Sequence, residues 1–431
     1  MKKFFAVLLI AGILFGLVAC QKKPKSVTLE IWNSSQTMTE FYDEVVTPEF
    51  KKLYPEVENV NVLYMPIQDY VKKIAVAVPA GDVPDLMEIE DSWATPFVTA
   101  EYFDPNTKEL DAILDQMRPE LRNLVTYKGK AYGVPISPFH ELMFYNLDIL
   151  KAAGITKIPD TWEEILDAAQ RTVKRDASGR IEVSGFSMRL GGNPAGTTQK
   201  FWVLALLGNG VDVFEESKTQ PGKFHCGFNN EGGYNALKMY IDMLYKYKID
   251  DFASMKDTEA FWNQRTAINM REASASTSII RNGPGVNWVT APMPIGYKQR
   301  ATFLICLNFY VPKGAKHKEY ARKYVELATS REMYRIQTER RAGFNPYIGV
   351  DPTEGLDARL KPGFVFPPDM KVYTVPVHNA YDASQVRLGE ALPNVFAKAE
   401  LLDNPEGIRR EIEALARIVN DAYREFDEFA E

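Results

Sequence analysis

The sequence predicts an α/β protein built as two lobes around open, largely parallel sheets. Three observations support this fold class. Short apolar strands alternate with amphipathic helices along most of the chain. The chain has 431 residues, more than a single hydrophobic core usually serves. Residues 131–165 combine strand, short helix, loop and capped helix, as expected for a segment that crosses between two lobes.

The first residues have the pattern of a targeting segment, which is set apart from the fold. Two lysines precede an apolar run at residues 4–17, and the sequence ending at Cys20 resembles the cleavage box of bacterial lipoproteins. We therefore predict a lipoprotein signal peptide over residues 1–19, then the lipidated Cys20 and a polar tether over residues 20–26. A transmembrane anchor is the alternative, but about 17 apolar residues is near the lower limit for a span.

The first lobe is predicted to begin with three strands and two helices. Apolar and polar residues alternate in the strands, and apolar residues recur at helical spacing in the helices. The strands are expected at residues 27–32, 60–65 and 83–89, and the helices at residues 41–54, with a break at Pro48, and 68–78. Ligands of such sheets bind beyond the carboxyl ends of the strands, which points to residues 34–36 and 90–93.

The crossing segment follows. Two short strands are expected at residues 132–136 and 141–146, separated by Pro138. A short helix at residues 148–153 should then end at Gly154. Thr161 can cap a further helix, and Glu164, three residues later, can complete a capping box.

The order of short motifs in this segment resembles the signature of extracellular solute-binding proteins of ABC importers. Within them it is similar to the carbohydrate branch that contains the maltose-binding protein. The motifs are Gly133-Val134-Pro135, Phe144-Tyr145-Asn146, Ala153-Gly154 and Pro159-Asp160-Thr161-Trp162-Glu163-Glu164-Ile165. The resemblance implies a two-lobe periplasmic-binding-protein fold of type II, the Venus-flytrap fold, with a hinge of three crossings.

The resemblance also implies where the lobes begin and end. The N-terminal lobe is expected to comprise residues 27–138 and 305–335, and the C-terminal lobe residues 142–300 and 342–431. A strand at residues 302–311 should return the chain to the first lobe, and a short loop at residues 341–346 should cross a third time.

In the second lobe a helix at residues 161–173 and a strand at 181–188 precede a glycine-rich loop at 189–198. The loop lacks the glycine-lysine-serine or threonine ending of a phosphate loop, so nucleotide binding is rejected. A helix at 199–207 follows. In relatives this loop and helix contribute ligand contacts, which makes Arg189, Gln199 and Trp202 candidates.

One later segment departs from the pattern that it resembles. Gln264-Arg265 stands where glycine-lysine is common in the family, and Ser274 stands where sugar-binding relatives often carry an aromatic residue. An aromatic platform is then expected from Trp262, Trp288 or Phe139. The last helix, at residues 405–429, has one strongly charged face, which is expected to be solvated.

The candidate ligand-binding residues come from the strand ends and from the resemblance. Asp91 and Trp93 are the leading candidates of the first lobe, although an N-cap role and a core role would explain them equally well. The full set is Trp32, Ser34, Gln36, Asp91, Trp93, Phe139, Arg189, Gln199, Trp202, Trp262, Arg271, Ser274, Trp288 and Asn345.

Composition excludes several other classes of function. With 57 acidic and 51 basic residues and no long run of one sign, the chain gives no support for nucleic-acid binding. The sequence shows no paired metal-ligand histidines, nucleophile elbow or cofactor fingerprint, so no enzyme, cofactor or metal is expected. Cys226 and Cys306 are expected to stay unpaired, Cys306 as a buried thiol in a strand.

The predicted function is that of a lipid-anchored, monomeric substrate-binding protein outside the cytoplasmic membrane, periplasmic or extracytoplasmic. The resemblance implies that it takes a carbohydrate between its lobes and passes it to an ABC permease in the inner membrane. Another polar solute such as a polyol phosphate is an alternative ligand. A secreted glycoside hydrolase, with two carboxylates about 5 to 10 Å apart, and a purely structural lipoprotein are competing hypotheses.

Overall fold

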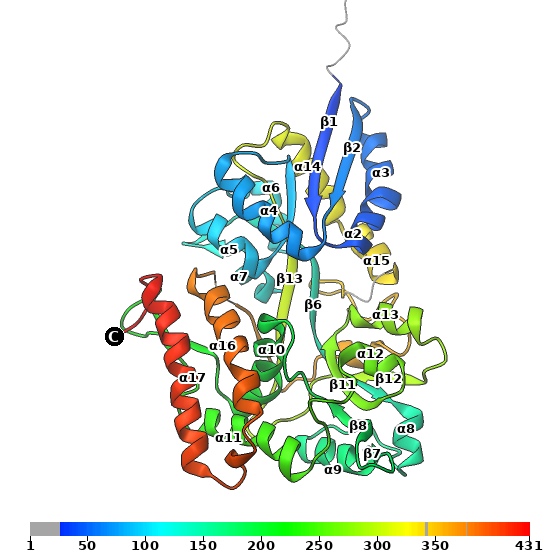
Figure 1. The fold of residues 1–431 in the computed structure, drawn as a ribbon. Helices are drawn as coiled ribbons and strands as arrows, with labels where there is room; N and C mark the ends of the chain where they lie inside the picture. Colours follow the sequence, from blue (N-terminus) through cyan, green and yellow to red (C-terminus); the bar gives the residue numbers. More distant parts are fainter. Residues whose placement is uncertain (1–25, 341–343, 376) are drawn as a thin grey trace, which may run out of the picture.

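The computed structural model describes residues 26–340, 344–375 and 377–431. The predicted signal peptide, Cys20 and most of the tether lie outside the described residues, as does the start of the loop at 341–346. Figure 1 shows two lobes joined by long strands. We call the lobe with β1, β2 and β3 the upper lobe and the lobe with β8 and β11 the lower lobe.

A single sheet of ten strands runs through both lobes within this part of the chain. Its order is β2-β1-β3-β13-β6-β11-β8-β7, with β12 beside β6 and β14 beside β13. The strands are β1 (Val27–Asn33), β2 (Val57–Tyr64), β3 (Leu86–Glu90), β6 (Gly133–Asn146), β7 (Lys174–Arg175), β8 (Ile181–Ser187), β11 (Thr266–Glu272), β12 (Trp288–Ala291), β13 (Arg300–Tyr310) and β14 (Met370–Tyr373). Two small sheets pair β4 (Thr126–Tyr127) with β5 (Lys130–Ala131) and β9 (Phe214–Glu216) with β10 (Phe224–Cys226).

The two lobes are connected by β6 and β13, which run antiparallel to each other. Strand β6 pairs with β13 from Gly133 to His140 and then with β11 from Glu141 onward. The sequence predicted two strands here, separated by Pro138, and the structure has one continuous strand. The pairing skips Ile136, because Leu307 lies opposite Ser137 and Asn308 lies opposite Pro135. This bulge lies between two prolines and accommodates their missing N–H groups.

The first helix of the upper lobe, which follows β1, is longer than predicted. It runs without a break from Gln36 to Leu53, through a π-helical turn at Tyr42–Val46. The N–H of Thr47 bonds to the carbonyl of Tyr42, five residues back, and Pro48 follows at the first turn of α3. Because a proline is tolerated in a first turn, Pro48 does not end the helix.

The helices of the upper lobe cover its part of the sheet (Figure 1). They are α2 (Gln36–Phe41), η1 (Tyr42–Val46), α3 (Thr47–Leu53), α4 (Ile67–Ala80), α5 (Asp91–Thr99), α6 (Lys108–Leu114), α7 (Pro119–Leu124), α14 (Lys318–Ala328) and α15 (Arg331–Arg340).

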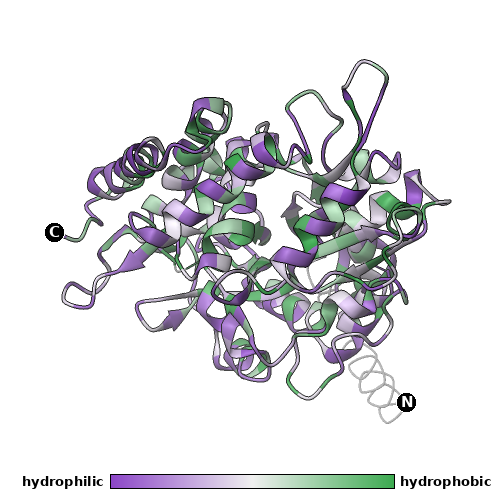
Figure 2. Ribbon diagram, turned by 90° about the horizontal axis from the view of Figure 1, so that it is seen from below, coloured by the Kyte–Doolittle hydropathy of each residue, from purple (hydrophilic) through white to green (hydrophobic). Residues whose placement is uncertain are grey.

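The remaining helices belong to the lower part of Figure 1 or to the connections. They are α8 (Leu147–Ala152), α9 (Trp162–Thr172), α10 (Pro194–Phe201), η2 (Trp202–Leu206), η3 (Leu207–Asn209), α11 (Glu231–Ile241), η4 (Asp242–Lys246), α12 (Asp257–Trp262), α13 (Ala275–Asn282), η5 (Lys361–Phe364), α16 (Ala380–Phe396), η6 (Ala399–Leu401) and α17 (Pro405–Glu425). In Figure 2 their turns alternate between hydrophilic and hydrophobic colours, as expected for helices with one buried face.

Local capping signals were predicted correctly. The hydroxyl of Thr161 accepts a hydrogen bond from the N–H of Glu164 at 3.2 Å, and the Glu164 carboxylate accepts one from the N–H of Thr161 at 3.3 Å. Gly154 ends the short helix with φ of 72°. Helix α10 starts five residues earlier than expected, because Asn193 caps it and Pro194 takes the first position.

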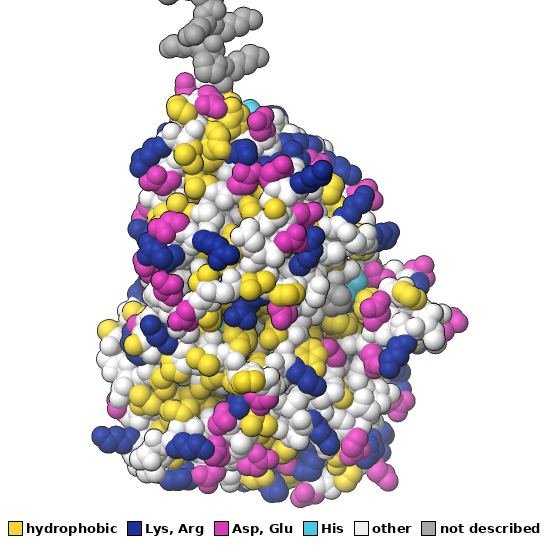
Figure 3. All heavy atoms as spheres, turned by 180° about the vertical axis from the view of Figure 1, so that it is seen from behind, with side chains coloured by type: hydrophobic (Ala, Val, Ile, Leu, Met, Phe, Trp, Pro, Cys, Tyr) yellow, Lys and Arg dark blue, Asp and Glu magenta, His cyan; other side chains and the backbone are white. Residues whose placement is uncertain are grey.

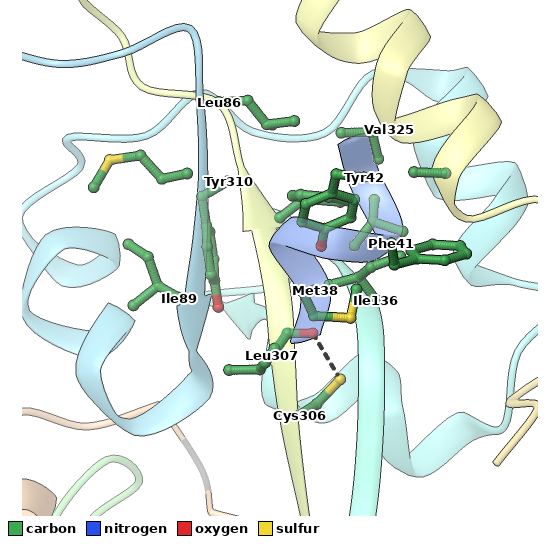
Figure 4. Close-up of a cluster of buried hydrophobic side chains, with 14 of the residues drawn as sticks. Met38, Phe41, Tyr42, Leu86, Ile89, Ile136, Cys306, Leu307, Tyr310 and Val325 are labelled. Atoms are coloured by element: carbon green, nitrogen blue, oxygen red, sulfur yellow. Dashed lines mark hydrogen bonds between the residues drawn. The ribbon is translucent and has the colours of Figure 1, made fainter. Parts of the chain in front are cut away.

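The buried side chains form two clusters. One is centred on the upper lobe and continues to Phe144, Phe261 and Trp288, and the other lies in the lower lobe. Figure 4 shows part of the upper core, where Met38 and Tyr42 belong to one buried cluster with Leu86, Ile136 and Tyr310 from three different strands. The lower core gathers side chains of α9, η2, α11, α16 and α17. Cys226 and Cys306 are both buried with free thiols, and the thiol of Cys306 donates to the carbonyl of Leu307 at 3.0 Å.

The outer surface mixes charged and apolar side chains. Figure 3 shows acidic and basic groups interspersed over the upper lobe and apolar groups gathered on part of the lower lobe. None of the described helices is long and apolar enough to cross a membrane.

Candidate functional site

A cavity of about 750 Å³ lies between the two lobes, and we call it the cleft. Its upper wall comes from the residues that follow β1 and β3 and from the start of α4. Its lower wall comes from α10, from the segment between β11 and the end of α13, and from α16. Side chains of β6 and β13 form the back. The lining residues include Ser34, Gln68, Glu90, Asp91, Trp93, Phe139, Arg189, Gln199, Lys200, Arg271, Glu272, Ser274, Arg281, Phe303, Tyr381, Asp382 and Gln385.

The position of the upper wall follows from the sheet. Strands β1 and β3 are parallel neighbours, so the residues after them meet at one edge. Ser34 follows β1, and Asp91 and Trp93 follow β3 at the start of α5. The alternation of strands and helices in the sequence was sufficient to predict that the loops after β1 and β3 line the site.

The position of the lower wall depends on a close helix contact. Gly389 of α16 packs against the start of α10, where a Cβ atom on Gly389 would lie 1.9 Å from the carbonyl oxygen of Pro194. Only a glycine permits this approach. It brings Tyr381 and Gln385 of α16 beside Gln199 of α10 in the cleft.

The structure places many of the predicted site residues in the cleft. Those that line it are Ser34, Asp91, Trp93, Phe139, Arg189, Gln199, Arg271 and Ser274. Trp93 and Phe139 are partly buried aromatic residues of the upper wall and the back. Their faces can stack on a ligand ring while neighbouring polar groups form hydrogen bonds.

Other predicted site residues lie outside the cleft wall. Trp202 and Trp288 are nearly fully buried: Trp202 packs against Phe303 with ring centroids 4.5 Å apart, and Arg359 covers Trp288. These two tryptophans are core residues, because their large side chains fill space between elements that the sequence alone does not bring together.

The remaining predicted residues outside the cleft have local partners. The ammonium group of Lys73 lies 4.2 Å from the ring centroid of Trp32. Gln36 is exposed at the start of α2. Trp262 packs beside Gly283, and the buried side chain of Asn345 accepts a hydrogen bond from the N–H of Tyr347 at 3.1 Å.

A chain of ion pairs forms one side of the cleft, and we call it the ion-pair chain. The ammonium group of Lys200 donates to Glu141 at 2.6 Å and to Glu272 at 3.2 Å. Arg271 donates to Glu272 at 3.0 Å and also to Asp257, which lies 3.4 Å from Arg189. Side chains of Lys200 and Glu141 are 4% and 1% exposed, so this end of the chain is shielded from water.

Burial and ion pairing shift the pKa values of these groups in opposite directions. Burial favours the neutral form of Glu272, but Arg271 and Lys200 outweigh it and hold the Glu272 pKa well below its usual value. Burial would lower the pKa of Arg271, while Glu272 and Asp257 raise it. For Glu141 burial prevails and raises the pKa, although Lys200 opposes it. The ion-pair chain therefore keeps its arginine and Glu272 charged.

The opposite side of the cleft is acidic. Burial raises the pKa of Glu90 to about 7; a hydrogen bond from Ser92 opposes the rise, and the charges of Asp382 and Glu272 add to it. Burial and then the charge of Glu90 raise the pKa of Asp91 well above its usual value. The Asp91 carboxylate accepts hydrogen bonds from the N–H groups of Ser92 at 2.8 Å and Cys306 at 3.2 Å. Asp91 thus ties α5 to the connecting strand β13.

A second cavity of about 440 Å³ lies in the lower lobe, and we call it the lower pocket. Arg189, Lys200 and Arg271 line both the lower pocket and the cleft. Asp257 stands at the wall of the lower pocket with φ of 62°, an uncommon backbone conformation outside glycine. Such conformations occur at functional sites, where neighbouring contacts hold them in place.

Sequence reasoning missed several residues of the cleft. Lys200 follows the predicted residue Gln199, and Glu272 follows the predicted residue Arg271. This adjacency was the signal in the sequence that could have identified them. Tyr381, Asp382 and Gln385 carried no local signal, because α16 reaches the cleft from a distant part of the chain.

The arrangement suits a polar ligand with apolar faces. The cleft offers aromatic surfaces, carboxylates, amides and guanidinium groups, which together recognise hydroxyl-rich molecules. Across the described ranges, no group of three or more histidine, cysteine, aspartate or glutamate side chains is arranged to hold a metal ion.

Comparisons with known proteins agree with this geometry. The sequence profile of a family described as bacterial extracellular solute-binding protein matches residues 35–334. A putative binding protein of Brucella abortus is 22% identical over 404 residues, 91% of each chain. The maltodextrin-binding protein MdxE of Bacillus subtilis is 24% identical over 361 residues, 77% of each chain.

A solved structure shows the same fold. It is an ABC transporter solute binding protein from Thermotoga lettingae, bound with alpha-D-tagatose, and it superposes with a TM-score of 0.74 at 23% identity. The similarity covers 91% of this chain and 100% of that chain. The predicted two-lobe α/β fold is thereby confirmed.

Proposed function

Because the chain belongs to the family of bacterial extracellular solute-binding proteins, we propose that it captures a sugar or oligosaccharide between its lobes for an ABC importer. It would deliver this ligand to the permease of the importer in the membrane. The observation that carries the proposal is the cleft of about 750 Å³, whose wall combines residues of both lobes.

The chemistry of the cleft supports a carbohydrate. Trp93 and Phe139 offer aromatic faces, and Gln199, Ser274 and Gln385 offer neutral groups that donate and accept hydrogen bonds. A phosphate or other anion fits less well, since Arg189, Lys200 and Arg271 are already paired with carboxylates and Glu90 and Asp382 also line the wall. The ligands named for two similar proteins, a maltodextrin and alpha-D-tagatose, support the same class of ligand.

Capture follows from the connection between the lobes. A ligand that touches both walls makes more contacts when the lobes approach each other, so it shifts the population toward the closed form. The lobes are proposed to comprise residues 27–138 with 305–335 and residues 142–300 with 342–431. The monomer would then close by bending at β6 and at β13.

The predicted leader adds a proposal about location. If residues 1–19 are removed and Cys20 carries lipid, the protein is tethered outside the cytoplasmic membrane by residues 20–26. Mass spectrometry of protein from membranes of the producing cell should find a diacylglycerol-modified Cys20. In the Cys20→Ala variant the protein should no longer fractionate with membranes, and unchanged fractionation would contradict the anchor.

The function is tested by a thermal-shift screen of the chain that begins at Val27. Monosaccharides, oligosaccharides, polyol phosphates and amino acids are compared. A sugar present at a thousand times its dissociation constant should stabilise the native state by about 4 kcal/mol, a shift of several degrees. A flat response to every sugar would overturn the carbohydrate proposal, and release of smaller sugars during incubation would indicate a hydrolase.

A substitution at Trp93 tests whether the sugar binds in the cleft. Trp93→Ala should weaken the binding of the stabilising sugar about tenfold or more in calorimetric titration, because a stacking face is lost. Trp262→Ala is the matched control, since Trp262 is also partly exposed but lies outside the cleft wall. Equal losses in both variants would contradict a binding role for Trp93.

A further inference from the structure

Two carboxylates stand on opposite walls of the cleft without an ion-pair partner. Glu90 ends β3 and belongs to the upper wall, whereas Asp382 lies in the first turn of α16 and belongs to the lower wall. Within the described ranges neither carboxylate forms an ion pair, and Glu90 accepts a hydrogen bond from the hydroxyl of Ser92 at 3.1 Å. Closure of the lobes brings the two walls, and with them these two groups, closer together.

The surroundings of Glu90 supply no counter-charge of its own. Strand β13 places the apolar Leu307 opposite it in the sheet. Lys200 and Arg271 are the cations of the adjoining lower wall, and both already donate to Glu272. The charged and titratable groups on the elements around Glu90 are Glu88 of β3, Asp91 of α5, Cys306 of β13, Tyr381 and Asp382 of α16, Arg271 and Glu272 of β11, and Lys200 of α10.

Closure changes the balance between the neutral and the charged form of these carboxyl groups. Like charges repel more strongly at shorter distance and with less water between them, so a carboxyl group there binds its proton more tightly. Burial already raises the pKa of Glu90 to about 7, and the charges of Asp382 and Glu272 add to the rise. Burial also raises the pKa of Asp382. The closed form should therefore keep a proton that the open form releases at the same pH.

We propose that capture of the sugar is coupled to the uptake of a proton from the solvent by Glu90, because Asp382 approaches it when the lobes close. The inference rests on the proposed function and deepens it, since it names a regulation of the same site. Coupling between two binding events is reciprocal. Closure strengthens the binding of the proton, so the protonated protein binds the sugar more tightly by the same factor. The affinity for sugar rises as the pH falls.

The first test needs no sugar and checks the interaction across the cleft. Carbon NMR of protein with labelled glutamate follows the titration of the Glu90 carboxyl group, and Glu90→Gln identifies its signal. Asp382→Asn should lower the pKa of Glu90, because a like charge is removed. Glu390→Gln is the matched control and should leave it unchanged, since Glu390 lies on the same helix, is likewise exposed and does not line the cleft. An unchanged Glu90 titration in Asp382→Asn overturns the inference.

The second test counts the protons taken up. Maltotriose, raffinose, arabinotriose and tagatose are titrated calorimetrically into the chain that begins at Val27, at about pH 7.5, in phosphate and in Tris. The two buffers differ in ionisation enthalpy, so the difference between the observed heats gives the number of protons taken up with each sugar. For a sugar that binds, we expect about half a proton, because Glu90 is partly protonated near this pH.

The affinity should follow the same linkage. The wild type should bind the sugar about tenfold more tightly at about pH 6 than at about pH 9. Glu90→Gln should take up no proton, and its affinity should change by less than about twofold over this range. Asp382→Asn should lie between the two, and Glu390→Gln should match the wild type. Melting curves without sugar check that each variant is folded.

The outcomes separate the inference from the proposed function. A sugar that binds with equal heats in both buffers and equal affinity at both pH values overturns the inference, while the proposed function stands. Proton uptake that persists in Glu90→Gln assigns the proton to another group and overturns it as well. If none of the four sugars binds to the wild type, the proposed function fails and the inference fails with it.

Discussion

Lys200 shows how much depends on single buried charges in this protein. Its ammonium group donates to Glu141 and Glu272, and its side chain is 4% exposed. A buried ion pair contributes little net stability compared with an apolar pair, but removing one partner leaves an uncompensated charge. The residue therefore holds two carboxylates in place beside the cleft.

The variant Lys200→Met should destabilise the protein by about 3 kcal/mol at neutral pH, because Glu141 and Glu272 lose a counter-charge. Urea unfolding measures the change. The double variant Lys200→Met with Glu141→Gln should recover part of the loss, since the second change removes one of the stranded charges. A double variant that is as unstable as the single one would contradict this explanation.

Glu90 should make stability depend on pH. Burial raises its pKa to about 7 in the folded protein from an ordinary value of 4.5. Between these two values the folded state binds a proton that the unfolded state has released, so stability falls as pH rises from about 4.5 to about 7 and is level above that range. The Glu90 contribution is thus fully present only at acidic pH.

The variant Glu90→Gln should remove this contribution to the pH dependence. At pH 5 the variant and the wild type should differ little, and at pH 8 the variant should be more stable by up to about 3 kcal/mol. Melting temperatures measured for both proteins across this range test the prediction. Parallel curves for the two proteins would show that Glu90 does not titrate as proposed.

At the scale of elements, the packing of α10 against α16 decides the shape of the lower wall. A Cβ atom on Gly389 would lie 1.9 Å from the carbonyl oxygen of Pro194, so the two helices would have to separate. Helix α10 carries Gln199 and Lys200, and α16 carries Tyr381 and Gln385. A small shift between the helices therefore changes the cleft.

The variant Gly389→Ala should lose about 1 to 3 kcal/mol of stability through overpacking, measured by urea unfolding. It should also bind the stabilising sugar more weakly. Gly191→Ala, in the loop before α10, is the matched control against the same α16, since its Cβ atom would meet Pro393 at an ordinary 3.8 Å. The control should stay within about 0.5 kcal/mol of the wild type. Equal losses in both variants would contradict the packing argument.

At the scale of the molecule, the buried side chains form two clusters, and β6 and β13 run through both lobes. Another contact between the lobes lies beside the cleft, where the hydroxyl of Thr99 donates to Asn379 at 2.5 Å. A ligand that touches both lobes can change their relative position by bending the shared strands.

Small-angle X-ray scattering should therefore record a smaller radius of gyration for the chain starting at Val27 when the stabilising sugar is added. The physical reason is the population shift toward a closed form that the ligand contacts with both walls. Trp93→Ala at the same sugar concentration is the control and should show less compaction. An unchanged scattering curve at saturating sugar would contradict closure.

Local signals in the sequence were sufficient for part of this description. The capping box of Thr161 and Glu164 and the helix end at Gly154 depend on residues a few positions apart, and the structure has both. The alternation of strands and helices was sufficient to point to Asp91 and Trp93, because parallel strands end at the same edge of a sheet. The ordered motifs of residues 131–165 identified the family.

Only the tertiary structure decided the rest of the site. Lys200 meets Glu141 across 59 positions of the chain and Glu272 across 72, and no local pattern marks such partners. No local pattern marked Trp202 and Trp288 as buried either. A tryptophan side chain suits a binding surface, but the packing of distant elements makes these two core residues. Hydrogen bonds within one turn and the period of apolar residues are encoded locally, whereas the groups that share a cavity are chosen by how distant elements pack.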